Sequence, residues 1–240
     1  PLVREFQERL EEYLQVKHVI PVCNGTIALE LAERALGFEK EVVMPSFTFI
    51  ATAHSLQWQQ ITPVFADIGK DDVTIDPESI RKVLTTDTSG IIGVHVYGNP
   101  CNFQEIHKIA KENNLKVLYD AAHAFGNEVN GVPIANFGDA SVFSFHATKF
   151  FNTFEGGAIA TNDSDIADIL RTMVNFGFPG NGCDSVVGLG VNGKMSEASA
   201  AMISASDDMS ISVYDTDNNR VDYSISKNAE GYLVYGQYYY

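Results

Sequence analysis

Basic residues are scarce in this sequence. Lys and Arg total 16 against 31 Asp and Glu in 240 residues, so the formal net charge is -15 and the pI is about 4.6. Such a surface repels phosphate backbones and anionic lipids, which makes nucleic acid and membrane poor partners for the surface as a whole. A pocket for one phosphate group remains compatible with this charge, because such pockets use backbone N–H groups and one or two side chains.

Cysteines and long apolar runs are scarce as well. The cysteines Cys23, Cys101 and Cys183 are odd in number, widely spaced and form no C-x-x-C pair, so neither a disulfide framework nor a metal site is indicated. No apolar run approaches the roughly 18 residues that a membrane span needs, and the charged first residues lack the apolar core of a signal peptide. We therefore expect a cytoplasmic protein.

Several common catalytic motifs are missing. The sequence has no G-x-S-x-G elbow, no Walker A motif, no H-E-x-x-H and no G-x-G-x-x-G after its first expected strand. The glycine-rich segment 188–193 follows no clear strand and starts no βαβ unit, so it carries little weight as a dinucleotide site.

Strand-like and helix-like segments alternate along most of the chain. Apolar spacing predicts strands at 18–22, 42–44, 61–65, 90–95, 116–119, 140–145 and 157–161, and helices at 2–14, 27–36, 47–57, 77–84, 103–112 and 164–173. This order predicts an α/β fold with a mostly parallel seven-stranded sheet and helices on both faces. Ligands of such sheets bind beyond the carboxyl ends of the strands, where the candidate residues are sought.

The composition changes near Ala201. Seven of the ten tyrosines fall in the last forty residues, and the alternating stretches 210–214 and 221–225 flank Asn218 and Asn219. This pattern is typical of a β-hairpin. We expect one large domain over 1–200 and an atypical Tyr-rich tail over 201–240.

Three polar residues follow expected strands. A lone lysine such as Lys149 is most often a solvated strand-end residue, but burial among neighbouring phenylalanines would depress its pKa and suit it to an aldehyde cofactor. Asp120 is either a helix N-cap or the counter-charge of a pyridinium nitrogen. His123 is either an ordinary surface or core histidine or a donor to the phenolate oxygen of such a cofactor.

The remaining candidates are also ambiguous when taken singly. Gly25 and Thr26 form an ordinary turn or supply phosphate donors at a helix start. Phe49 is a core aromatic of the expected helix or a platform stacked on a ring. Ser144 lines a strand or holds a phosphate oxygen.

Six segments taken together, in order, are more specific than any one of them. They are N-G-T-I-A-L at 24–29, P-S-F-T-F-I-A-T at 45–52, D-A-A-H-A-F-G at 120–126, S-F-H-A-T-K at 144–149, E-G-G-A at 155–158 and N-G-K-M-S-E at 192–197. The set covers about residues 1–200, and in order and spacing it resembles the DegT/DnrJ/EryC1/StrS family of nucleotide-sugar aminotransferases.

The resemblance implies the large domain of a fold-type-I enzyme that uses pyridoxal 5'-phosphate. It makes Lys149 the Schiff-base lysine and proton shuttle, and it pairs Asp120 with the pyridine nitrogen. His123 would sit near the phenolic oxygen, and Phe49 would stack on the ring. The phosphate would be held by Gly25, Thr26, Ser144 and, from the partner subunit of a homodimer, Asn192.

The resemblance also implies a reaction. Family members that dehydrate sugars carry a histidine at the position of Lys149, so the lysine favours transamination. The implied enzyme moves an amino group from an amino acid, glutamate, to a keto group of a nucleotide-linked deoxysugar, in polysaccharide or antigen biosynthesis.

Two departures from the family pattern leave an alternative open. Gly193 and Lys194 stand where the family has an aromatic residue and Arg, which affects substrate contacts more than cofactor binding. The pattern fades near Ala201, and the smaller C-terminal domain of the family is not recognisable after it. Fragments of the tail faintly resemble the long helix that normally follows in the family, but with residues out of place. The alternative is a catalytically incomplete relative that acts as a binding or regulatory module. The segments 144–149 and 192–197 argue against a third reading, an amino-acid lyase of the same fold type.

Overall fold

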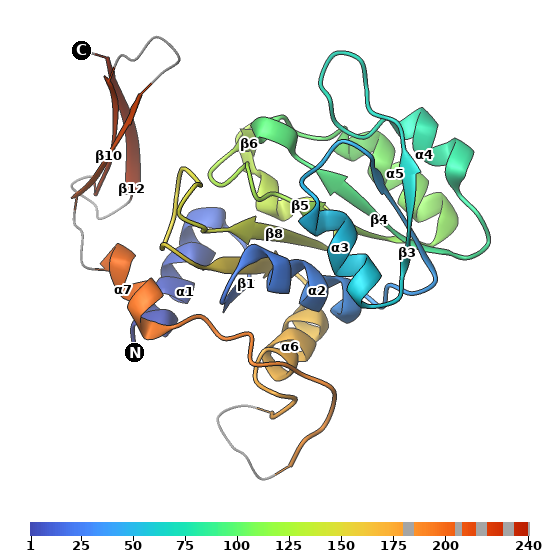
Figure 1. Cartoon of the computed structure of the whole chain (residues 1–240), viewed down its shortest axis with the longest axis horizontal. Coiled ribbons are helices and arrows are strands. Elements are labelled where there is room, and N and C mark those ends of the chain that lie inside the picture. The colour runs from blue at the N-terminus through green and yellow to red at the C-terminus, as the bar shows by residue number, and fades with distance from the viewer. Residues whose placement is uncertain (180–184, 205–207, 215–219, 228–232, 240) are drawn as a thin grey trace.

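One seven-stranded sheet organises most of the chain (Figure 1). The computed structural model describes residues 1–179, 185–204, 208–214, 220–227 and 233–239. Across the sheet the strands are β1 (His18–Val22), β9 (Gly157–Thr161), β8 (Ala140–Ser144), β5 (Lys116–Asp120), β4 (Thr88–Val94), β2 (Glu41–Pro45) and β3 (Thr62–Ala66). β9 runs antiparallel to both of its neighbours, and the other adjacent pairs are parallel. All strands except β9 therefore end at the same edge of the sheet.

Helices cover both faces of this sheet. One buried cluster joins it to α1 (Leu2–Leu14), α4 (Pro77–Val83), α5 (Phe103–Asn113) and α7 (Glu197–Ser204). A second cluster joins the opposite face to α2 (Gly25–Ala35), α3 (Ala51–Trp58) and α6 (Ser164–Met173). Side-chain caps start α2, α4, α5 and α6, at Asn24, Asp76, Asn102 and Asp163. These residue types accept hydrogen bonds from the free N–H groups of a first helical turn.

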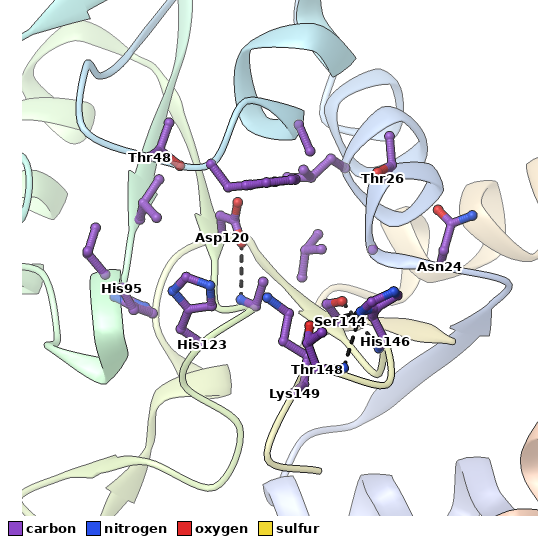
Figure 2. A pocket seen from close by; sticks show the side chains of 18 of the residues that line it. Asn24, Thr26, Thr48, His95, Asp120, His123, Ser144, His146, Thr148 and Lys149 are labelled. Carbon is purple, nitrogen blue, oxygen red and sulfur yellow. Dashed lines mark hydrogen bonds between the residues drawn. The ribbon is translucent and has the colours of Figure 1, made fainter. Parts of the chain in front are cut away.

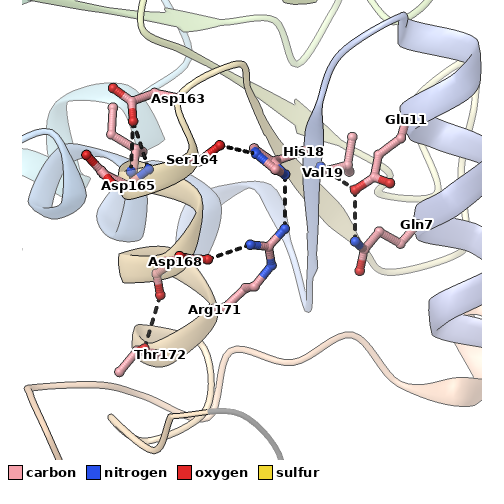
Figure 3. Close-up of polar contacts among 11 residues, drawn as sticks. Gln7, Glu11, His18, Val19, Asp163, Ser164, Asp165, Asp168, Arg171 and Thr172 are labelled. Atoms are coloured by element: carbon pink, nitrogen blue, oxygen red, sulfur yellow. Dashed lines mark hydrogen bonds and ion pairs between the residues drawn. The ribbon is translucent and has the colours of Figure 1, made fainter.

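The edge strand β1 is fixed by polar contacts on both sides (Figure 3). On one side the backbone N–H of Val19 donates to Glu11 of α1 at 3.0 Å. On the other, Arg171 of α6 donates to His18 Nδ1 at 3.1 Å, so the proton of this ring lies on Nε2, 2.9 Å from the hydroxyl of Ser164. These contacts hold the strand whose end leads into α2.

A cluster of aromatic rings anchors the loop after β8. Phe6 of α1 packs edge-on against Phe145, with ring centroids 5.8 Å apart, and stacks on Phe151 at 6.3 Å. Phe125 stacks on Phe151 at 4.3 Å. Because Phe145 and Phe151 flank Lys149 in the chain, this packing holds both ends of the loop that carries the lysine.

The expected α/β class and mostly parallel sheet are confirmed, with differences at element ends. The helix expected over 47–57 begins only at Ala51. The backbone N–H of Ser46 still donates to Ala66 O, so pairing with β3 continues past the end of β2 and the chain needs several residues to turn back. β4 ends at Val94, one residue before its expected end.

Short elements without strong periodicity were not predicted. They are the ribbon of β6 (Glu128–Val129) and β7 (Val132–Pro133) and the 3-10 turns η1 (Val96–Gly98) and η2 (Ile134–Asn136). None of the described helices has the length and apolar character needed to cross a membrane.

The tail contains a separate antiparallel sheet of β10 (Asp208–Tyr214), β11 (Arg220–Lys227) and β12 (Leu233–Tyr239). The turn expected at Asn218 and Asn219, like Cys183, lies outside the described residues. The division of the chain near residue 200 stays a prediction.

The aromatic cluster makes a prediction about stability. Replacing Phe6, which is 1% exposed, with Ala should lower the free energy of unfolding by about 3–5 kcal/mol, because a buried ring is lost and a cavity remains. Phe154→Ala, at a ring that is 61% exposed, serves as the control and should cost less than about 0.5 kcal/mol. Urea unfolding of both variants measures the difference; equal losses would contradict the anchoring role of Phe6.

Candidate functional site

A cavity of about 790 Å³ opens at the carboxyl edge of the sheet (Figure 2). Its walls come from the segments that follow β1, β2, β4, β5 and β8, as expected for a parallel sheet. Seven of the predicted site residues line it, namely Gly25, Thr26, Phe49, Asp120, His123, Ser144 and Lys149. A volume of this size suits a small-molecule ligand or cofactor.

Lys149 lies in the turn after β8, and its side chain points into the cavity on the side of Asp120 and His123 (Figure 2). Its backbone N–H donates to His146 O at 2.8 Å, and its carbonyl accepts from the amide of Asn152 at 3.2 Å. Burial lowers the pKa of the Lys149 amine, and the charge of Asp120 partly opposes this effect. A lowered pKa increases the share of neutral amine, the form that attacks an aldehyde.

Asp120 is a buried carboxylate at the end of β5, with 6% of its surface exposed. The hydroxyl of Thr52 donates to its Oδ2 at 2.9 Å, and the backbone N–H of Ala122 donates to its Oδ1 at 3.1 Å. The next element after β5 is the short strand β6, so the helix N-cap interpretation of Asp120 is wrong. Within the described residues no salt bridge engages the carboxylate, which leaves its charge for a cationic group of a ligand.

His123 forms a wall of the cavity with Tyr97. The two rings are nearly parallel, with centroids 6.0 Å apart. Burial and the neighbouring Lys149 lower the pKa of His123, against the opposing charge of Asp120. The neutral imidazole that this favours carries one N–H, which suits it to donate to an oxygen of a ligand.

The N-terminus of α2 forms one end of the cavity. Asn24 caps the helix by accepting a hydrogen bond from the backbone N–H of Ile27 at 2.9 Å. Gly25 and Thr26 come before Ile27 in the first helical turn, where backbone N–H groups have no acceptor within the helix. A Cβ atom added to Gly25 would lie 2.9 Å from the Cβ of Ser144. Only glycine therefore lets the helix start approach the end of β8 so closely. The backbone N–H groups, the helix dipole and the hydroxyls of Thr26 and Ser144 together suit a phosphate group.

Phe49 precedes α3, lines the cavity and is 71% exposed. The interpretation of Phe49 as a core aromatic of the helix is therefore wrong. Its stacking on a cofactor ring stays a prediction.

Asn192 does not line the cavity of its own chain. Its side-chain oxygen accepts from Lys194 Nζ at 2.8 Å, and that ammonium group lies 4.5 Å from the centre of the Phe176 ring. The carbonyl of Gly193 accepts from the backbone N–H of Cys23 at 2.8 Å, which ties this segment to the residue before Asn24. A role of Asn192 at a partner's phosphate stays a prediction.

Sequence patterns did not single out Thr52, the donor to Asp120. It lies in the quoted segment 45–52, and its hydroxyl also lies 2.8 Å from that of Thr48. The i, i+4 spacing of Thr48 and Thr52 indicates that the two side chains are neighbours on the expected helix. It does not indicate that the carboxylate of Asp120 lies beside them.

The residues present fit pyridoxal phosphate in three respects. The helix start with Gly25 and Ser144 suits its phosphate, the buried carboxylate of Asp120 suits its pyridine nitrogen, and the half-buried Lys149 suits its aldehyde. All three lie on one cavity, which is the arrangement that a single ligand with these groups requires.

The chain is similar to a family of known proteins. The family model described as "DegT/DnrJ/EryC1/StrS aminotransferase family" matches residues 1–206. The chain is 45% identical over 201 residues to a dTDP-4-amino-4,6-dideoxy-D-glucose transaminase of Shigella dysenteriae, covering 84% of the chain and 54% of the relative. It is 37% identical to a GDP-perosamine synthase of Escherichia coli O157:H7, covering 69% and 46%.

Solved structures of aminotransferases are similar to the chain as well. DesI, crystallised in the presence of its TDP-sugar product, superposes with a TM-score of 0.79 at 48% identity, over 84% of this chain and 51% of DesI. An ntda structure from Bacillus subtilis with bound cofactor PMP gives a TM-score of 0.80 at 32% identity, over 84% and 46%. The chain spans about half the length of the curated relatives it matches.

The electrostatics of the cavity give a direct prediction. Asp120→Asn should lower the pKa of Lys149 further, because the charge that opposes the burial effect is removed. The rate at which an amine-reactive reagent modifies Lys149 can be followed by mass spectrometry at a series of pH values. The midpoint of the curve of rate against pH should lie at lower pH in Asp120→Asn than in the unaltered chain. Asp67→Asn, at an exposed carboxylate outside the cavity, is the control and should leave the midpoint in place. An unchanged or higher midpoint in Asp120→Asn would contradict the coupling.

Proposed function

The chain belongs to the DegT/DnrJ/EryC1/StrS aminotransferase family, and from this membership and the geometry of the cavity we propose that the protein is a pyridoxal-phosphate-dependent nucleotide-sugar aminotransferase. The observation that carries the proposal is the meeting of Lys149, Asp120 and the start of α2 on one cavity. The ntda neighbour, whose structure contains PMP, supports the cofactor.

In this proposal each residue acts at a stated atom. Pyridoxal phosphate supplies an aldehyde and an electron-withdrawing ring. Asp120, fixed by Thr52, would pair with the pyridine nitrogen, and His123 would donate to the phenolic oxygen. Lys149 would hold the cofactor through its aldehyde group and would carry a proton to and from the reacting carbon of the substrate. Its lowered pKa supports this second role, because an amine that gives up its proton more readily is more available as a base.

The substrate class follows from the relatives. The matched proteins include a dTDP-amino-sugar transaminase and a GDP-perosamine synthase, so we propose a keto group on a nucleotide-linked deoxysugar as the amino acceptor. An amino acid, glutamate, is the proposed donor. The expected cytoplasmic location stays a prediction.

We also propose that the active site is shared within a homodimer. Asn192 lies outside its own cavity, and apolar side chains near it in sequence are exposed: Val186 is 62% exposed, Val187 64% and Leu189 71%. Exposed apolar residues gathered in one segment are typical of a surface that another chain covers. In this proposal the partner's Asn192 would contact the phosphate of the cofactor in the neighbouring site.

The cofactor role of Lys149 can be tested by absorbance. Purified chain mixed with pyridoxal phosphate should gain the visible band of the lysine-bound cofactor, and glutamate should bleach it as the amino group moves to the cofactor. Lys149→Ala should lose the band, whereas Lys82→Ala, at an exposed lysine outside the cavity, should keep it.

Two results would count against this function. Absence of the band in the unaltered chain would refute the cofactor assignment. A band that no amino donor bleaches would favour the alternative, a relative that binds the cofactor without turnover.

The shared site makes a separate prediction. Lys149→Ala and Asn192→Ala chains should each bind or use the cofactor poorly. When they are mixed under conditions that exchange subunits, one intact site per mixed dimer should restore part of the lysine-bound absorbance and of the turnover. A mixture that shows no more than the sum of its components would contradict a site shared between subunits.

A further inference from the structure

A carboxyl group that the proposed reaction does not use is buried behind the site. Glu33 of α2 is 0% exposed and lies against α3. The hydroxyl of Ser55 lies 2.6 Å from its Oε1, and the amide of Gln59 donates to its Oε2 at 2.6 Å. Burying a carboxyl group costs much less when the group is neutral and fully hydrogen-bonded than when it is charged.

The contacts of Ser55 fit a protonated Glu33. Its hydroxyl lies 2.6 Å from Glu33 Oε1 and also 3.2 Å from the carbonyl oxygen of Thr52. A hydroxyl carries one proton and cannot donate to both oxygens at once. Both contacts become hydrogen bonds if Glu33 is the acid: its O–H donates to Ser55 Oγ, and Ser55 donates to the Thr52 carbonyl. Its other oxygen then accepts from Gln59.

The charged groups around Glu33 also favour the neutral form. Burial, with smaller effects from Glu30 and Asp120, raises the pKa of Glu33 well above its ordinary value, against the hydrogen bonds from Ser55 and Gln59. Arg34, the cation nearest in sequence, donates to the side-chain oxygen of Gln59 at 3.0 Å instead of to Glu33. Among the described residues no salt bridge neutralises the Glu33 carboxyl.

The cluster leads directly to the catalytic carboxylate. Ser55 contacts the backbone carbonyl of Thr52, and the hydroxyl of Thr52 donates to Asp120 Oδ2 at 2.9 Å. Glu33, Ser55 and Thr52 thus connect α2 and α3 to the end of β5. Asp120 is within electrostatic reach of Glu33, so a second negative charge there would compete with the one that the site needs.

We propose that Glu33 is a positioning residue, a buried carboxylic acid whose proton completes a hydrogen-bond chain through Ser55 to Thr52 and thereby fixes the carboxylate of Asp120. The role rests on the proposed function, in which Asp120 faces the pyridine nitrogen. As a neutral group, Glu33 orients α3 behind the site. Asp120 is then the one negatively charged side chain among Glu33, Ser55, Thr52 and Asp120.

The protonation of Glu33 is tested on the cofactor-free chain by infrared spectroscopy at neutral pH. The unaltered chain should show the carbonyl stretch of a protonated carboxylic acid, and Glu33→Gln should lose it. Absence of the band, or its persistence in Glu33→Gln, overturns the neutral-acid assignment.

The positioning role is tested by cofactor affinity. Glu33→Gln keeps a neutral group that donates to Ser55 and accepts from Gln59, so its affinity for pyridoxal phosphate should match that of the unaltered chain. Glu33→Ala should bind roughly ten-fold more weakly, because the chain of buried hydrogen bonds is broken. Ser55→Ala breaks the same series of hydrogen bonds and should weaken the affinity for pyridoxal phosphate in the same way. It tests the positioning role if Glu33→Ala does not fold. Ile80→Ala, at a buried residue on the opposite face, is the control for destabilisation alone and should retain the affinity.

The outcomes separate this role from the proposed function. Unaltered affinity in both Glu33→Ala and Ser55→Ala, or a Glu33→Gln variant as weak as Glu33→Ala, overturns the positioning role. If the unaltered chain takes up no pyridoxal phosphate, the proposed function fails and the positioning role with it, while the infrared band still decides the state of Glu33.

Discussion

The burial of the Asp120 carboxylate beside the amine of Lys149 is the constraint on which the rest of the site depends. A carboxylate that is 6% exposed persists only with donors, and Thr52 and Ala122 supply them at fixed distances. The same charge offsets part of the effect of burial on the Lys149 amine. The parallel sheet makes this arrangement possible because β5 and β8 end at the same edge, so residues far apart in sequence meet across one cavity.

Packing on both faces of the sheet keeps these groups in place. On one face Phe6 contacts the rings that flank Lys149, so the lysine loop is tied to α1 by apolar burial. On the other face α2 supplies both the helix start next to Ser144 and the buried Glu33, and α3 supplies Thr52. The helices that cover the sheet therefore also position the reactive groups, and a change in their packing is expected to reach the site.

Much of this could be predicted from the sequence. Strand and helix periodicity predicted the α/β class. Seven of the eight site residues predicted from the six sequence segments line one cavity. The start of α3 and the exposure of Phe49 could not be predicted, because helical spacing continues through 47–50 whereas Ser46 still pairs with β3 and residues 47–50 form the bend that leads into α3. The contacts of Thr52 and Glu33 could not be predicted either, since they depend on how α2 and α3 pack, which periodicity does not specify.

In the proposed function Lys149 is the residue that binds pyridoxal phosphate covalently. The most direct measurement is to load the chain with the cofactor, reduce the linkage with borohydride and map the modified lysine by peptide mass spectrometry. The added mass should lie on Lys149 and disappear when Lys149 is replaced by Ala. Modification of a different lysine, or no stable modification of the loaded chain, would contradict it.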